Sequence, residues 1–432
     1  MFLFLFTNLI NLNIINKKRS HMQINLIPIY SFLHKKNQKV LNEDLLFIDE
    51  INNFLMDEDL LICERAKEPL FDLVLIGSGG TENLFLKRLK TIKEPIVILS
   101  TSRNNSLPAC LEIKTYLENH NKLCFLLSGS EEHIANMLKH IATIINAYNS
   151  IIDSKLGAIG GASSWLIASP IEPKKIYDNF KIKTVKIPMK EFDELINETE
   201  QEMIDINEVP HANELMNKFE NKDVTHQAIV FYLALKKIVK KYDLRGLTIK
   251  CFDLLKKYKN TACLALALLN EEGIVSGCEG DMPSLITMYI IYTLTGRSSF
   301  MANPSKFNYE DNSILLAHCT VPLNMTSSYS LTTHFESGLG IGVRGEMPEG
   351  KITICKIAPD FSLEDTICLP ASIKECPHLE GYCRTQIVVS LNEEGLLDIL
   401  KASFGNHLIV SYGEVYQDLL PLLSLLRRNK EK

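Results

Sequence analysis

An acidic residue at the end of a buried-looking strand is the first feature of this chain that could do chemistry. Glu279 lies in the segment GCEGDMPS, between Gly277 and Gly280, where an apolar run ends and a helix is predicted to begin. In open α/β sheets, ligands bind outside the carboxyl ends of the strands. Glu279 is therefore a candidate site residue, because a carboxylate at that edge is placed to meet a ligand.

Asp281 lies two residues further along and has two interpretations. It precedes Met282, Pro283 and Ser284, which is the pattern of a helix N-cap followed by a proline in the first turn. One interpretation is that Asp281 caps this helix. The other is that its carboxylate takes part in the same site as Glu279.

Three histidines are candidate ligands. His318 in LLAHC and His407 in FGNHLIVSYG lie at the edges of apolar, strand-like runs, and His334 in TTHFESG precedes a flexible glycine stretch. A histidine in such a position is either a hydrogen-bonded core residue or a ligand. No H-x-H or H-E-x-x-H spacing is present to decide between the two. Spacing alone therefore does not assemble a metal site.

Other kinds of chemistry find little support in the sequence. There is no G-x-S-x-G nucleophile motif, and none of the 11 cysteines stands in a setting that suggests a nucleophile. The cysteines are scattered singly without a C-x-x-C pair, which fits reduced thiols in the cytoplasm better than a disulfide framework. With a net charge of -6 and dispersed basic residues, the chain has no electrostatic feature that favours nucleic acid as a partner.

The elements that must position these residues alternate between strands and helices over most of the chain. At 432 residues, two or three domains are expected. Residues 22–152 and 153–295 each show strands, turns and helices in succession, which predicts two doubly wound α/β domains. The second contains an amphipathic pattern that predicts a helix over about 224–242.

The pattern changes in residues 296–432. Short β-type runs separated by Gly, Pro and Asn clusters predict an antiparallel sheet or barrel, closed by a helix over about 414–427. The predicted fold class is therefore α/β, with two doubly wound parallel-sheet domains followed by a smaller antiparallel β-rich C-terminal domain.

The first 21 residues are apolar but are interrupted by four asparagines, and their positive charge follows the apolar run. A signal peptide has the reverse order, and a membrane-spanning helix needs about 20 mostly apolar residues. We expect Met22 to be the natural start, with an upstream extension before it. No other segment has the length and apolarity of a membrane span, so no membrane partner is expected.

Four segments in order resemble the L-fucose isomerase-like proteins of the L-fucose and L-arabinose isomerase superfamily. The first runs from ACLALALLNEEGIVSGCEGDMPS to GRSSFMANPS, and ILLAHCTVPL, CRTQIVV and FGNHLIVSYGEVYQDLLPLLSLL follow it. The resemblance covers residues from about 155 to 430, whereas residues 22–150 share only the general α/β pattern. It is specific because several motifs recur in order at similar separations.

The resemblance implies a metal site. Members of the superfamily hold a divalent cation, usually manganese, with two acidic residues and a histidine. By position these correspond to Glu279, Asn303 and His407, and His318 matches a further active-site histidine that is expected to bind substrate. Mn²⁺ is thus the implied cofactor, with Mg²⁺ as the other option. Asn303 departs from the family pattern, because an amide offers a carbonyl oxygen but no charge and no proton transfer.

The implied reaction is the interconversion of an aldose and a ketose through an enediol. A metal that bridges the oxygens at C1 and C2 would stabilise the developing charge, while a carboxylate carries the proton between the two carbons. Glu279 is the implied proton carrier, and Asp281 is the second catalytic candidate because it could compensate for the charge that Asn303 lacks. Trp165 and Arg344 are candidates for contacts with sugar hydroxyls, although Trp165 could pack behind LGAIGG and Arg344 could lie in a hairpin turn.

Two other functions stay open on the sequence. The asparagine at position 303 motivates a non-catalytic or repurposed sugar-binding descendant, and an isomerase or lyase for a phosphorylated or sulfonated sugar is the third option. The expected partners are a small-molecule sugar and further copies of the chain, since members of the superfamily assemble as homo-oligomers.

Overall fold

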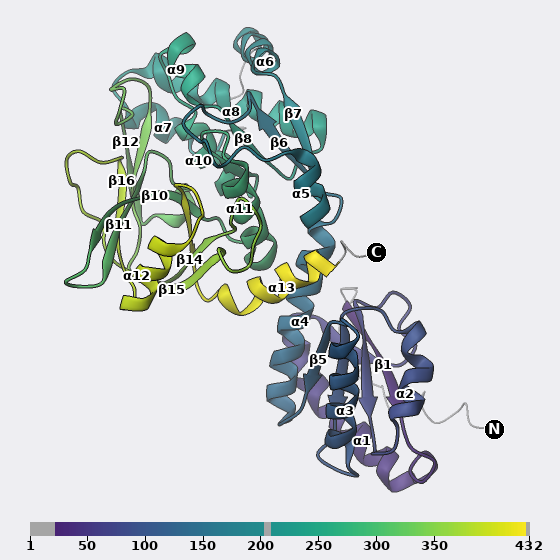
Figure 1. Ribbon diagram of the computed structural model, residues 1–432. Coiled ribbons are helices and arrows are strands. Elements are labelled where there is room, and N and C mark those ends of the chain that lie inside the picture. The colour runs from purple at the N-terminus through teal and green to yellow at the C-terminus, as the bar shows by residue number, and fades with distance from the viewer. Residues whose placement is uncertain (1–21, 203–208, 429–432) are drawn as a thin grey trace. The chain divides into compact units, whose positions relative to one another are not determined.

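A computed structural model describes residues 22–202 and 209–428 of the chain (Figure 1). The predicted upstream extension, residues 1–21, lies outside the described residues. Contacts between residues divide the chain into two compact units, Met1–Ala142 and Thr143–Lys432. The domain boundaries that the sequence suggests stay predictions.

A five-stranded parallel sheet with the strand order β2-β1-β3-β4-β5 forms the first unit. Its strands are β1 (Met22–Ile29), β2 (Leu60–Cys63), β3 (Phe71–Ile76), β4 (Ile96–Ser100) and β5 (Cys124–Leu127). The helices α1 (Gln38–Leu55), α2 (Glu82–Arg88), α3 (Ser106–Asn119) and α4 (Glu131–Ile151) alternate with them. Every residue of β3 and β4 is buried, as is typical of parallel strands covered on both faces.

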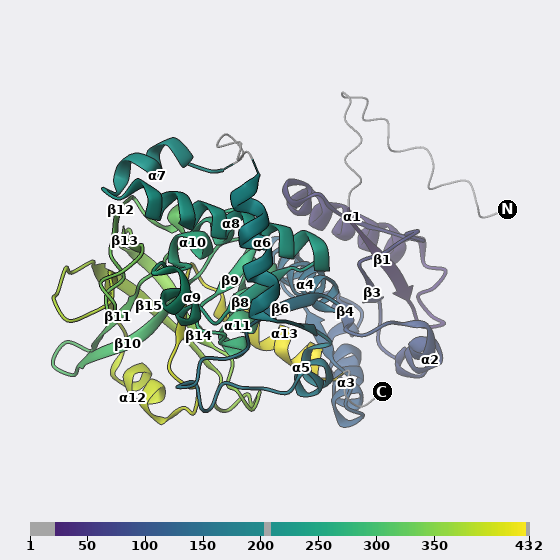
Figure 2. The same ribbon diagram turned by 90° about the horizontal axis from the view of Figure 1, so that it is seen from above.

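The second unit contains a four-stranded parallel sheet with the order β7-β6-β8-β9. Its strands are β6 (Lys155–Ile159), β7 (Lys183–Ile187), β8 (Gly246–Ile249) and β9 (Val275–Gly277). Its helices are α5 (Pro173–Phe180), α6 (Met189–Gln201), α7 (Ala212–Lys218), α8 (Lys222–Tyr242), α9 (Phe252–Tyr258), α10 (Cys263–Glu271) and α11 (Met282–Thr295). In Figure 2, α6, α8 and α10 lie side by side.

The amphipathic helix predicted over about 224–242 is confirmed as α8. It begins two residues earlier because the side chain of Asn221 accepts the N–H groups of Asp223 and Val224 and so caps the first turn.

A closed antiparallel barrel with the order β10-β11-β16-β15-β14-β17 completes the second unit. Its strands are β10 (Phe300–Asn308), β11 (Ser313–His318), β14 (Gly350–Lys356), β15 (Ile367–Glu375), β16 (Thr385–Ser390) and β17 (Leu408–Tyr412). The hairpin of β12 (Ser328–Thr332) and β13 (Gly342–Glu346) and the helices α12 (Glu393–Lys401) and α13 (Tyr416–Arg428) accompany it. The predicted fold class is confirmed: α/β units with parallel sheets are followed by an antiparallel β-rich part.

Strand order in the barrel decides which residues meet. β10 is hydrogen-bonded to β11 on one side and to β17 on the other, although β11 and β17 are far apart in sequence. Helix α11 packs against β9 and also against β14 and β17. The start of α11, the end of β11 and the start of β17 are thereby brought together.

None of the helices in the described part of the chain combines the length and the apolar character that a membrane span requires.

Candidate active site

Glu279 lies in the short connection between β9 and α11, at the carboxyl edge of the parallel sheet. Its φ angle is 61°, in the left-handed region that residues other than glycine rarely adopt. Backbone strain of this kind costs energy and tends to occur at functional sites. The side chain is buried, with 8% of the residue exposed, so the tight turn directs a carboxylate into the protein.

Gly280 makes this turn possible. A Cβ atom at position 280 would lie 2.0 Å from the backbone oxygen of Gly161 and 2.7 Å from the Cα of Ala162, and the φ angle of Gly280 is also positive, at 73°. Only glycine allows these two connections of the parallel sheet to approach so closely.

Replacing Gly280 by alanine is therefore expected to destabilise the chain by about 3 kcal/mol. The backbone of Gly161 and Ala162 would have to move away from the new Cβ atom, and the alanine would have to adopt a strained positive φ angle. Gly296 is the matched control: it has a positive φ of 63° and open space around it, so Gly296→Ala should cost only about 1 kcal/mol. Urea denaturation of both variants measures the difference, and equal losses would show that the contact with Gly161 is not tight.

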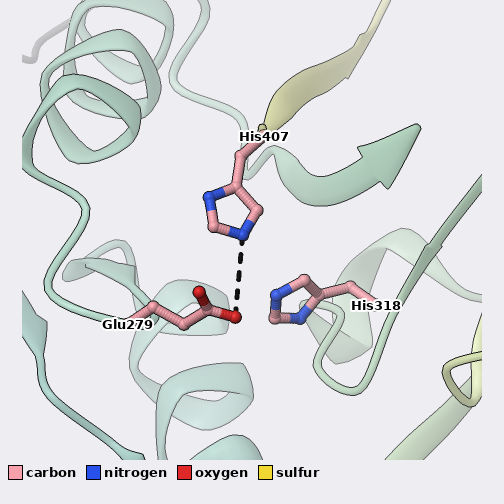
Figure 3. Close-up of side chains that lie close together, drawn as sticks. All are labelled: Glu279, His318 and His407. Carbon is pink, nitrogen blue, oxygen red and sulfur yellow. Dashed lines mark ion pairs between the residues drawn. The ribbon is translucent and has the colours of Figure 1, made fainter. Parts of the chain in front are cut away.

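Three buried side chains meet around one point: Glu279, His318 and His407 (Figure 3). Each offers a ligand atom, and these atoms all lie within 4.8 Å of one another. Glu279 Oε1 and His407 Nε2 are 3.8 Å apart, and the centroids of the two imidazole rings are 5.6 Å apart. His318 is the last residue of β11 and His407 immediately precedes β17, so the two barrel strands that pair with β10 place both rings.

Two nitrogen atoms in this cluster are buried without a partner. His318 Nδ1 and His407 Nε2 have no hydrogen-bond partner among the described residues. A buried polar atom without a partner is costly, and such atoms are usually satisfied by a ligand, an ion or water. One carboxylate and two imidazole nitrogens within 4.8 Å of one another therefore fit a divalent transition-metal ion.

The protonation states of Glu279 and His318 suit the binding of a metal ion. Burial alone would raise the pKa of Glu279, but His407, His318 and the indole N–H of Trp165 outweigh it and hold the pKa below its ordinary 4.5. Burial, with a smaller contribution from His407, lowers the pKa of His318 to about 4. At neutral pH the carboxylate is thus ionised and the His318 ring is neutral, as metal ligands must be.

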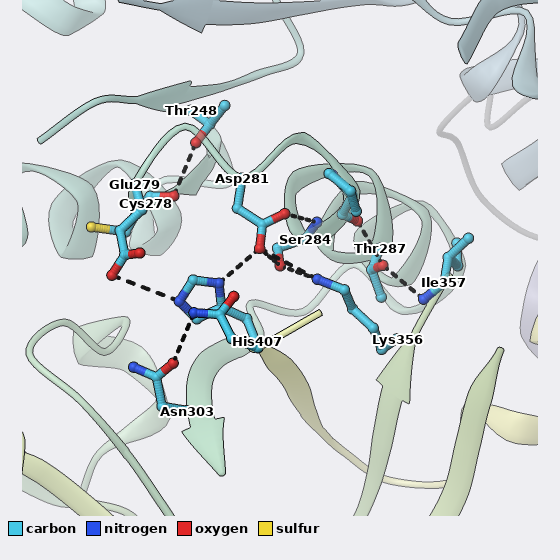
Figure 4. Close-up of polar contacts among 12 residues, drawn as sticks. Thr248, Cys278, Glu279, Asp281, Ser284, Thr287, Asn303, Lys356, Ile357 and His407 are labelled. Carbon is cyan, nitrogen blue, oxygen red and sulfur yellow. Dashed lines mark hydrogen bonds and ion pairs between the residues drawn. The ribbon is translucent and has the colours of Figure 1, made fainter. Parts of the chain in front are cut away.

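The Nδ1 side of the His407 ring, opposite the side that lies toward Glu279, is held by a fully buried chain of polar contacts (Figure 4). Its Nδ1 lies 2.7 Å from Asp281 Oδ2, and Lys356 Nζ, at the end of β14, lies 3.4 Å from the same oxygen. The backbone N–H and the hydroxyl of Ser284 also donate to Asp281, at 2.9 and 2.7 Å. Burial would lower the pKa of His407, but Asp281 and Glu279 outweigh it and raise the pKa above 6.5.

Asp281 does cap α11, as one of the two interpretations predicted. Its carboxylate does not line the cavity beside Glu279, because all its contacts are to Ser284, Lys356 and His407. These contacts suit a residue that orients His407 rather than one that meets a substrate. The prediction of a direct catalytic role for Asp281 therefore gains no support from the geometry.

Trp165 contacts the candidate carboxylate directly. Its Nε1–H donates a 2.7 Å hydrogen bond to Glu279 Oε2, and its ring packs edge-on against Phe252, with centroids 4.8 Å apart. The residue is 48% exposed, so it lies at the border between the site and solvent. The predicted contact with sugar hydroxyls is compatible with this position, but the sequence held no sign of the bond to Glu279.

The cavity beside Glu279 brings together segments from across the second unit. Asn303 lines it, so the predicted metal position lies near the cluster, with its Oδ1 accepting a 3.4 Å bond from Asn406 Nδ2. The other lining residues include five cysteines and several polar side chains: Cys251, Cys263, Cys278, Cys319, Cys383, Thr261, His334 and Glu336. The metal-ligand role predicted for Asn303 stays a prediction.

Arg344 is not brought to this cavity. It lines a separate hollow together with Phe335, His378 and Arg384. The predicted contact of Arg344 with substrate therefore has no support from its position.

His318 lies closer to the chemistry than the sequence suggested. It was expected to bind substrate, yet its ring belongs to the group of side chains that could hold a metal ion. Lys356 was missed altogether. Its one signal in the sequence is a lysine inside the apolar run KITICKIA, where a charge is rarely tolerated without a partner.

Comparison with known proteins adds a relationship over nearly the whole chain. No family model matches it. A sulfoquinovose isomerase of Clostridium sp. (strain MSTE9) is 24% identical over 416 residues, which cover 90% of this chain and 89% of that protein. A sulfoquinovose isomerase of Priestia aryabhattai is 21% identical over 399 residues, covering 88% and 87%. The chain is thus similar over nearly its whole length to sulfoquinovose isomerases, which agrees with the resemblance of its own motifs to the L-fucose and L-arabinose isomerase-like superfamily.

Proposed function

We propose that this chain is an aldose–ketose isomerase in which Glu279, His318 and His407 hold a divalent cation and Glu279 carries the proton. The observation that supports this best is the cluster of three buried side chains, Glu279, His318 and His407, whose ligand atoms lie within 4.8 Å of one another, with Nε2 of His407 left without a hydrogen-bond partner. The names of the relatives agree with an isomerase acting on a sugar.

The residues of the site divide the reaction between them. When bound, a divalent cation would polarise the adjacent oxygens at C1 and C2 of the sugar. The ionised carboxylate of Glu279 takes the proton from C2, which gives an enediolate, and returns it to C1, while the proton of the C2 hydroxyl passes to the C1 oxygen. The indole N–H of Trp165 holds Glu279 Oε2 in place, which leaves Oε1 on the side of His407.

The cation itself is proposed to be Mn²⁺. Two imidazoles and one carboxylate form a ligand set with two nitrogen ligands, whereas the set inferred from the sequence has only one. A ligand set richer in nitrogen suits transition metals better than Mg²⁺. The carboxylate oxygen of Glu279 and an amide oxygen from Asn303 are ligands that manganese also binds well, so Mn²⁺ remains the favoured transition metal.

The test is conversion of an aldose by the full chain, stripped with chelator and then supplied with Mn²⁺. Sulfoquinovose is the first substrate to try because the relatives carry its name, with L-fucose and L-arabinose beside it. NMR should show the ketose only when Mn²⁺ is present. Binding of a sugar without any conversion would instead indicate a sugar-binding protein.

Binding of Mn²⁺ is expected to weaken as the pH falls. The pKa of His407 is raised above 6.5 by Asp281 and Glu279, so a proton competes with the metal below that pKa. The pKa of His318 is lowered to about 4, so its ring adds no competition until much lower pH. Calorimetric titrations should show the apparent Kd rising about tenfold per pH unit below the His407 pKa, with one proton released per metal bound. A Kd that is constant between about pH 7.5 and 5.5 would contradict His407 as a ligand.

We also propose that the chain works as a homo-oligomer in the cytoplasm, by analogy with its superfamily. Light scattering on the full chain should then give a multiple of 48.9 kDa.

A further inference from the structure

We infer that Lys356 is a positioning residue of the metal site, which acts through Asp281 to leave the Nε2 atom of His407 free for the cation. The inference rests on the metal site proposed above. Lys356 itself is not among the residues that line the cavity, and in the described part of the chain its polar contacts are to Asp281 and Ser284 and not to Glu279 or His318.

Lys356 lies in the interior of the second unit. Its side chain is fully buried, with 0% exposed, in a strand whose neighbouring residues Ile354 and Cys355 are apolar and equally buried. A buried ammonium group is expensive unless it is paired. Its partners are the Asp281 carboxylate, at 3.4 Å, and the hydroxyl of Ser284.

The pairing with Lys356 helps to fix the carboxylate of Asp281. Four donors converge on the carboxylate: the Ser284 N–H binds Oδ1, while the Ser284 hydroxyl, Lys356 Nζ and His407 Nδ1 all lie against Oδ2. Donors on two sides fix the carboxylate in one orientation. Oδ2 is then held at 2.7 Å from the imidazole and has the character of an acceptor only.

The fixed oxygen of Asp281 decides which ring nitrogen of His407 carries the hydrogen. A neutral imidazole carries its hydrogen on one nitrogen and a lone pair on the other. An acceptor at Nδ1 places the hydrogen there, so the lone pair lies on Nε2, which faces Glu279 Oε1 at 3.8 Å. Partners of this kind behind a ligand histidine typically change metal affinity by 10- to 100-fold when they are removed. Here Asp281 is the partner of His407, and Lys356 in turn fixes the Asp281 oxygen that accepts the hydrogen bond from His407.

Two readouts test the inference, both at one fixed pH above the pKa of His407, where the ring is neutral in the parent. Protein labelled with ¹⁵N-histidine reports which ring nitrogen carries hydrogen, and His407→Gln identifies the His407 signals among those of the 11 histidines. In the parent, Nδ1 should be protonated and Nε2 bare. In Lys356→Met, the Nε2 signal should move toward the protonated form, and the Mn²⁺ Kd should rise by about 10- to 100-fold.

A double-mutant cycle shows whether Lys356 acts through Asp281. Asp281→Asn removes the charge but keeps an oxygen that can cap α11. In this background, Lys356→Met should change the Mn²⁺ Kd by less than about twofold, because coupled residues are not additive. Thr287→Val is the control, since Thr287 binds Ile357 N, next to Lys356, without touching Asp281. It should leave both readouts as in the parent.

The outcomes separate this inference from the proposed function. If the parent binds no Mn²⁺, the proposed metal site fails, and the NMR signals still decide the role of Lys356. An unchanged bare Nε2 in Lys356→Met, or an effect on Kd that persists in Asp281→Asn, would overturn the inference. Should Lys356→Met not fold, Lys356→Gln and the double variant supply the same comparisons.

Discussion

Replacing Glu279 by glutamine is expected to lower kcat by about 1,000-fold or more and to weaken Mn²⁺ binding at the same time. Glutamine keeps the size of the side chain and can still accept the hydrogen bond from Trp165, but it neither carries a proton nor brings negative charge. A group that both moves the proton and binds the cation should affect kcat and metal affinity together. Initial rates at saturating sugar, with Mn²⁺ well above its Kd, isolate the loss of proton transfer.

Glu349→Gln provides the matched control, because it makes the same change at an exposed position on the same unit. It should leave the rate and the Mn²⁺ affinity as in the parent. If Glu279→Gln loses Mn²⁺ affinity but retains kcat at saturating metal, another residue carries the proton. Glu336 and His334, which line the same cavity, would be the next to replace.

Replacing Lys356 by methionine is expected to destabilise the second unit by about 3–5 kcal/mol. Lys356 and Asp281 are both fully buried, and removal of one partner leaves an uncompensated charge in the interior. Burial would raise the pKa of Asp281, but Lys356, the strongest of the opposing charges, helps to hold it well below its usual range. Methionine fills most of the space of the lysine side chain, so the loss reports the charge more than the packing.

Adding Asp281→Asn to Lys356→Met should recover most of that stability. The buried charge is then gone, and asparagine remains a good N-cap for α11. Guanidinium denaturation of the parent, both single variants and the double variant measures the recovery. A double variant as unstable as the sum of the two single ones would show that the two side chains do not compensate each other.

The fold could be predicted from sequence because its periodicities are strong. The long apolar face of α8 and the continuous apolar strands of the parallel sheets identify their elements without help from tertiary structure. Helix α12 was not predicted, although Asn392 caps it through Gly395 N. It is short, and its few apolar residues follow a strand-like run in a part of the chain where strands were expected.

The site could be predicted only in part. Glu279 and His407 were identified through motifs that resemble a family, and the structure brings them to within 3.8 Å of each other. Trp165 lies 114 residues before Glu279, and Lys356 lies 75 residues after Asp281, so no local pattern links them. Contacts of that kind depend on how the strands of the barrel pair, which spacing along the chain does not reveal.

Glu279, His318 and His407 are proposed to hold a divalent cation together. Diffraction from crystals of the full chain grown with Mn²⁺, measured at a wavelength where manganese scatters anomalously, tests this proposal most directly. We predict one strong anomalous peak bound by a Glu279 oxygen, a nitrogen of His318 and Nε2 of His407. Anomalous peaks only elsewhere, or none at Mn²⁺ concentrations that support sugar conversion, would contradict the account.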